Sequence, residues 1–156
     1  MAENSSFEYV FLGDVDLTFK AIPKDVYTLQ VSGAAIKDIT YGKGEKKGTT
    51  GQVAKLQLTV VDHPEYSGRR LFETVFPDDN GFRNLRRLQD STGVVQAQNE
   101  PLPVWLERLN EVKPTFKVSV DQVQAKDFTT KLPRVDEAGA PVMENRVIWK
   151  EAVPAV

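Results

Sequence analysis

The stretch "AKLQLTVVDHPEYSGRRLFETVF", Ala54 to Phe76, decides the fold because it holds two strand-like runs joined by a tight corner. In the first run, Ala54–Val60, apolar residues alternate with polar ones, a pattern typical of a strand with one buried face. The corner "HPEYSG" contains turn-forming residues, and Gly68 supplies the backbone freedom that such a turn requires. The run "RRLFETVF" then predicts the next antiparallel strand.

Three further runs extend this sheet. "YTLQV" (27–31) and "FKVSV" (116–120) also alternate, and "NRVIWKE" (145–151) is predicted as a last strand. Between the first two strands lies "TYGKGEKKGTTGQ" (40–52), with four glycines, three lysines and no aliphatic side chain. This composition predicts a long hairpin loop.

The pattern becomes helical after the third strand. "DDNGFRNLRRLQDSTG" (78–93) carries an apolar stripe, with Asp79 or Asn80 able to cap its start and Gly93 placed to end it. The stripe consists of Phe82, Leu85 and Leu88. A second short helix is predicted in "PVWLERLNEV" (103–112), where the proline favours the first turn.

This order of elements predicts a mainly β protein. Five antiparallel strands with a short helical insertion between strands three and four match an OB-like barrel, the oligonucleotide-binding architecture. We expect an N-terminal extension over 1–21, the OB-like domain over 22–151 and a short C-terminal tail over 152–156. A length of 156 residues suits one such domain.

Composition excludes several classes of site. The chain has no cysteine and a single histidine, His63, so thiolate zinc sites, cysteine nucleophiles and His-rich metal sites are absent from the sequence. No apolar run has the length of a membrane span, and the N-terminus lacks the features of a signal peptide. The net charge is −2, but residues 43–87 carry nine Lys and Arg against six Asp and Glu. The positive excess therefore coincides with the corner and its flanking strands.

The order of five pieces carries a resemblance to a known family. They are "IPKDVYTLQV", "KKGTTGQVAKLQLTVVDHPEYSGRRLFETV", "NLRRLQDSTG", "FKVSVDQVQAKDF" and "ENRVIWKE", which together span most of the chain from Ile22 to Lys150. This succession resembles a group of bacteriophage proteins found among replication and recombination genes. Members of that group are often described as single-stranded DNA-binding proteins with an oligonucleotide-binding fold.

The resemblance implies a non-enzymatic protein of the host-cell cytoplasm that binds single-stranded DNA without a cofactor. It leaves open whether phage or host replication and recombination proteins also bind, and whether the chain forms oligomers. Many single-stranded DNA-binding proteins recruit partners through a strongly acidic C-terminal tail. This chain ends "WKEAVPAV", with one acid and one base, so recruitment of partners through such a tail is left open.

The candidate DNA-binding residues are cations that can meet phosphates and aromatic rings that can stack on bases. Arg70 and Phe72 share one face of the third strand, while Arg69 points to the other, and Phe72 suits either the core or a base-stacking platform. Arg86 and Arg87, in the first predicted helix, could either contact DNA or belong to a solvated helix face. The full set is Tyr41, Lys43, Lys46, Lys47, Lys55, Tyr66, Arg70, Phe72, Arg86 and Arg87.

Catalytic motifs are scarce. Asp62, His63 and Glu65 are neighbours, but side chains diverge in a turn and no second histidine completes a constellation. The segment "GKGEKKG" lacks the spacing of a phosphate-binding loop. The alternative to DNA binding is a phage structural or assembly protein, a β-sandwich whose loops contact other subunits.

Overall fold

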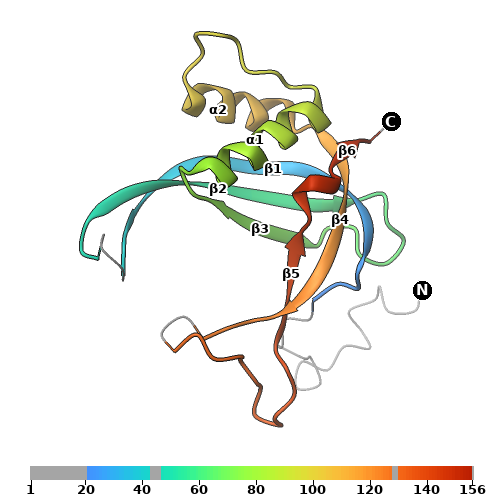
Figure 1. Cartoon of the computed structure of the whole chain (residues 1–156). Coiled ribbons are helices and arrows are strands. Elements are labelled where there is room, and N and C mark those ends of the chain that lie inside the picture. Colours follow the sequence, from blue (N-terminus) through green and yellow to red (C-terminus); the bar gives the residue numbers. More distant parts are fainter. Residues whose placement is uncertain (1–20, 43–46, 128–129, 156) are drawn as a thin grey trace, which may run out of the picture.

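The computed structural model describes residues 21–42, 47–127 and 130–155 and shows a mainly β protein with two helices packed on its sheet (Figure 1). All strands belong to one antiparallel sheet, in the order β3-β2-β1-β4-β5 with β6 added beside β4. The strands are β1 (Asp25–Thr40), β2 (Thr50–Val61), β3 (Arg70–Val75), β4 (Thr115–Gln124), β5 (Met143–Val147) and β6 (Val153–Pro154). The helices are α1 (Asp79–Thr92), α2 (Leu102–Val112) and the 3-10 turn η4 (Trp149–Glu151).

Alternation along the strands separates a buried face from an outward face, as the sequence predicts. The buried face of the three central strands is made of Tyr27, Leu29, Val31, Leu56, Leu58, Val60, Phe116, Val118 and Val120. Leu85 and Leu88 of α1 and Trp105, Leu106 and Leu109 of α2 complete this core. Both helices lie on the same side of β1, β2 and β3 (Figure 1), so neither α1 nor α2 covers the opposite face of these strands.

The boundaries of α1 follow from its caps. Asp78, rather than the expected Asp79 or Asn80, is the N-cap, and its carboxylate accepts a hydrogen bond of 2.7 Å from the Gly81 backbone N–H. Gly93 ends the helix in the left-handed conformation, with φ 75°, as predicted. Proline stands in the first turn of α2, also as predicted.

A side chain of α2 binds the backbone of β1 just after a bulge. The register with β2 shifts between Val31 and Gly33, and the next residue, Ala34, is bound by the side chain of Asn110. The Ala34 N–H donates to Asn110 Oδ1, and Asn110 Nδ2 donates to the Ala34 carbonyl, each over 2.6 Å. This amide therefore satisfies both backbone groups of Ala34, which lies beyond Gln30, where the pairing of β1 with β4 ends.

The structure differs from the predicted five-stranded OB-like barrel, because the sheet is not closed into a barrel. The sheet contains six strands, and β3 and β5 are its two ends rather than hydrogen-bonded neighbours. A side chain bridges them instead: the backbone N–H of Val147 in β5 donates to Glu73 Oε1 in β3 over 3.3 Å. The last strand is also shorter than expected, because a 3-10 turn begins at Trp149. The ring of Trp149 stacks on the ring of Phe116, with 5.9 Å between the ring centroids.

Two features mark the ends of the folded domain. Ile22 is fully buried, and its backbone N–H and carbonyl are both hydrogen-bonded to the side chain of Asn145. Val153 and Pro154 pair with β4, so part of the predicted C-terminal tail extends the sheet. The predicted extension over 1–21 lies outside the described residues, apart from position 21.

Candidate nucleic-acid interface

The outward face of β2 and β3 brings together three of the predicted site residues, Lys55, Arg70 and Phe72. The register pairs Lys55 with Thr74, Gln57 with Phe72 and Thr59 with Arg70. Because alternate residues share a face, these six side chains form one surface, which we call the outward patch. It contains two cations and no carboxylate.

Phe72 is the most exposed large apolar side chain of the described residues, at 71%. The core is filled by its neighbours Leu71 and Val75, which lie on the other face of β3. An isolated exposed valine or leucine is ordinary on a protein surface, but a whole phenylalanine ring costs more to leave in water. Phe72 therefore offers a bare aromatic face to a ligand.

Arg70 and Lys55 flank this ring without an acidic partner. Within the part of the chain that the structure describes, the ion pairs are Arg86 with Asp90 and Arg108 with Glu100. Lys55 donates to the Thr74 hydroxyl over 2.7 Å, which holds its ammonium close to β3. Among the described residues, neither Arg70 nor Lys55 is therefore in an ion pair.

A hydroxyl and amide network lines the neighbouring part of this face. Ser32 Oγ lies 2.8 Å from Thr59 Oγ1 and donates to the Gln57 carbonyl over 3.1 Å, while Gln57 Nε2 donates back to Ser32 Oγ over 3.1 Å. The network fixes short polar side chains between β1 and β2. Phe72, Arg70 and Lys55 lie beside these hydrogen-bonded side chains on the same face of the sheet.

Tyr41 and Lys47 lie at the hairpin between β1 and β2. The ring of Tyr41 is half-buried over Gly51, where a Cβ would come within 2.7 Å of it. Lys47 is exposed in the turn, and the backbone of Tyr41 pairs with Gly48 and Thr49. The other predicted loop cations, Lys43 and Lys46, lie outside the described residues.

Tyr66 packs into the corner instead of standing free. Its ring lies 5.0 Å from the ring of His63 and 6.4 Å from that of Tyr27, and it contacts the core. His63 Nδ1 accepts hydrogen bonds from the backbone N–H groups of Glu65 and Tyr66, so its role in the structure is to hold the turn. Gly68 closes this corner with φ 94°, as the sequence predicts.

The two helix arginines have different surroundings. Arg86 is exposed and forms an ion pair with Asp90 one helical turn later, at 3.0 Å. Arg87 is half-buried, donates to Asn84 Oδ1 over 3.2 Å and faces the free edge of β3. Of the pair, only Arg87 borders a cleft.

That cleft lies between α1, β3, β5 and η4 and has a volume of about 500 Å³. Its cations are Arg87, Arg146 and Lys150, and its carboxylate is Glu73. Burial raises the pKa of the Glu73 carboxyl from 4.5 to about 7, against the lowering effects of the Val147 N–H and Arg146. The other residues that line it are Thr74, Val75, Asn80, Asn84, Val147, Ile148 and Trp149.

Sequence reasoning missed Arg146, Lys150 and Glu73 as members of one site. Each looks like an ordinary strand or tail residue in the sequence, because the contact between β3 and β5 joins positions 74 residues apart. Asn145, which lies in the last segment of the family resemblance, does not line this cleft. Its side chain binds Ile22 rather than a ligand.

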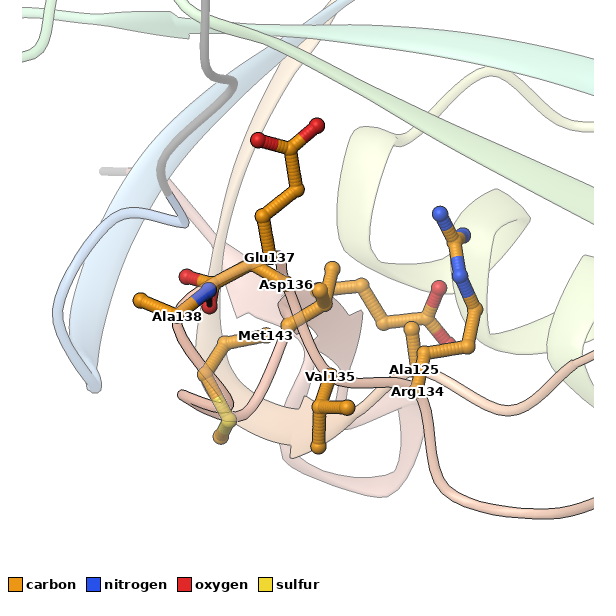
Figure 2. Close-up of a pocket in the computed structure, with 9 residues that line it drawn as sticks. Ala125, Arg134, Val135, Asp136, Glu137, Ala138 and Met143 are labelled. Atoms are coloured by element: carbon orange, nitrogen blue, oxygen red, sulfur yellow. Dashed lines mark hydrogen bonds between the residues drawn. The ribbon is translucent and has the colours of Figure 1, made fainter.

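A larger hollow of about 860 Å³ lies within the β4–β5 loop. Figure 2 shows Arg134 and Glu137 extending to one side of it, and Val135 and Met143 to the other. Asp136 accepts hydrogen bonds from the backbone of Ala138 and Ala140, so this carboxylate shapes its own loop. Several carboxylates make the hollow a poor site for a polyanion, and no cluster suited to a metal ion occurs among the described residues.

Comparisons with protein-family models, curated protein sequences and solved structures find no match to this chain. The resemblance to phage single-stranded DNA-binding proteins therefore stays a prediction. In the described ranges, no helix combines the length and apolar character that crossing a membrane requires.

Proposed function

We propose that this protein binds single-stranded DNA without catalysing a reaction, using the outward patch of β2 and β3. The observation that carries the proposal is the exposed ring of Phe72 beside Arg70 and Lys55. Stacking of bases on an aromatic ring, together with cations that attract the phosphates, is the usual basis of sequence-tolerant single-strand binding.

The strand order supports an OB-like assignment within this proposal. The order β3-β2-β1-β4-β5, with helices inserted between β3 and β4, is that of an OB-like sheet left open between β3 and β5. OB folds bind oligonucleotides on the face of strands 2 and 3 and at the loops that join strands 1–2 and 4–5. The outward patch has that location, and Tyr41 and Lys47 stand at the first of these loops.

Contact with another protein is the second candidate function, and one feature favours it. Phe76 and Phe82 are both about half-exposed and line an apolar groove with Ile36, Leu102 and Pro103. Exposed apolar clusters of this kind often mark protein contacts. The β-sandwich expected for this alternative is wrong for the described residues, because their strands form a single sheet.

Mapping by NMR separates the two candidates. Titration of a short dT oligonucleotide into ¹⁵N-labelled protein should shift the backbone amides of Thr59, Arg70 and Phe72. The amides of Phe76 and Phe82 should move little, because their groove lies outside the outward patch. Shifts confined to the Phe76 and Phe82 groove, or none at millimolar oligonucleotide, would contradict the proposed surface.

A further inference from the structure

We infer that the cleft between α1, β3, β5 and η4 is a phosphate-binding site, separate from the outward patch but adjoining it. The phosphate can belong to a polynucleotide backbone that continues from the outward patch, or to a free nucleotide. The first source rests on the proposed function, whereas the second does not.

The lining of the cleft matches phosphate chemistry. Three elements contribute one cation each: Arg87 from α1, Arg146 from β5 and Lys150 from η4. Guanidinium groups bind phosphate oxygens through paired N–H donors, and an ammonium adds a point charge. The amides of Asn80 and Asn84 add neutral hydrogen-bonding groups at the same wall.

No ion pair among the described residues involves these three cations, although Asp121 lies across from Arg146 in the ladder between β4 and β5. Arg87 uses one N–H on Asn84, which orients the guanidinium and leaves its other donors available. Arg86, the residue just before Arg87, is by contrast in an ion pair. A cleft that concentrates positive charge attracts anions strongly.

Glu73 is the one carboxylate in the lining, and its surroundings reduce the negative charge that would repel a bound anion. It sits at the junction of β3 and β5 and accepts the Val147 N–H. The raised pKa of this carboxyl, to about 7, leaves it partly protonated near neutral pH. With Arg87 and the exposed side chains of Arg146 and Lys150, the lining of the cleft therefore carries more positive than negative charge.

Thr74 connects the two surfaces. Its side chain belongs to the outward patch, where it accepts from Lys55 over 2.7 Å, and it also lines the cleft. A polyanion crossing the free edge of β3 at Thr74 would pass from Lys55 directly to Arg87. The open edge between β3 and β5 thereby becomes part of a continuous basic path.

Titration with tripolyphosphate tests the site without DNA. The chain has two tryptophans, both buried; Trp149 lines the cleft, whereas Trp105 does not and donates to the Val94 carbonyl. Tripolyphosphate should shift the indole N–H resonance of Trp149 and leave that of Trp105 in place. The double variant Arg146→Ala with Lys150→Ala, whose side chains are exposed, should weaken this binding about tenfold or more.

Arg87→Ala should have a similar effect, and Arg86→Ala is its matched control on the same helix, expected to bind like wild type. An unmoved Trp149 resonance, or equal affinity of all variants for tripolyphosphate, would overturn the inference even if the protein binds DNA. Folding of each variant is checked by its amide spectrum.

Two further probes distinguish the sources of phosphate. If the backbone occupies the cleft, the double variant should lose affinity for dT20 several-fold more than for dT6. If a free nucleotide occupies it, the variant should lose dTTP binding and keep dT20 affinity. Either result supports the phosphate site, and failure of Phe72→Ala to weaken dT20 binding would count against the proposed function alone.

Discussion

Phe72 lies directly across from Gln57 in the ladder between β2 and β3, with its ring on the face that neither α1 nor α2 covers. Gln57 is held by Ser32, so the strand beneath the ring is fixed while the ring itself stays in solvent. A base that stacks on Phe72 would meet a preorganised surface and displace loosely held water.

Replacement of Phe72 by alanine tests this surface. Phe72→Ala should cost about 1 to 3 kcal/mol of binding free energy for a dT oligonucleotide, the typical loss for one stacking platform. Thermal stability should change little, because the ring contributes little to the core. Phe82→Ala, which removes a half-exposed ring outside the outward patch, should leave affinity unchanged. Equal losses in both variants would indicate a non-specific effect.

Removal of Arg70 or Lys55 should act on the salt dependence of binding. Each lost phosphate contact should reduce the slope of log affinity against log salt by about 0.7 for single strands. Arg70→Ala and Lys55→Ala are therefore each expected to flatten this slope, and Arg86→Ala, whose charge is already paired with Asp90, should not. Isothermal titration at several salt concentrations supplies the slopes. If the slope is the same for wild type and all three variants, Arg70 and Lys55 do not contact the phosphates.

Much of the architecture could be predicted from sequence because local patterns determine it. The alternating runs at 27–31, 54–60 and 116–120 lie within β1, β2 and β4, and both helices occur where their apolar stripes predict. Local alternation of apolar and polar residues could not decide whether Phe72 is buried or exposed. In the segment from Arg70 to Phe76, apolar residues occur on both faces, so only the packed neighbours decide which face is buried.

Tertiary features escaped prediction for a different reason. The bridge from Glu73 to Val147 and the cleft beside it depend on where two sheet ends meet, which no local pattern encodes. Tyr66 was expected to be a stacking residue because it lies in a loop, and this stays a prediction; the structure shows its ring half-buried, 6.4 Å from the ring of Tyr27. Loop position alone therefore does not show whether an aromatic ring is available to a ligand.

The Glu73 carboxyl should make stability depend on pH. Its pKa is raised in the folded state to about 7, so folding favours the protonated form. This contribution is fully present below about pH 4.5, the unfolded value, and is lost as pH rises through 7. Its full size is about 3 kcal/mol. Urea denaturation should show that Glu73→Gln gains stability relative to wild type between pH 5 and pH 8. A constant difference over that range would contradict the buried-carboxyl account.

Asn110 should be important for stability rather than for binding. Asn110→Ala leaves the N–H and carbonyl of Ala34 without their partners and should lower the free energy of unfolding by about 2 to 4 kcal/mol. The exposed neighbour Glu111 provides the control, since Glu111→Ala should change stability by less than about 0.5 kcal/mol. Denaturant titration of the two variants measures both values, and equal effects would refute the role of the amide in pairing the Ala34 backbone.

Fluorescence anisotropy with labelled poly-dT at low salt tests the central claim most directly. The account predicts saturable binding that weakens as salt rises, changes little among single strands of mixed sequence and is much poorer for duplex of equal length. Absence of binding at tens of micromolar protein, or a strong preference for duplex, would contradict the claim that the outward patch of β2 and β3 captures single-stranded DNA.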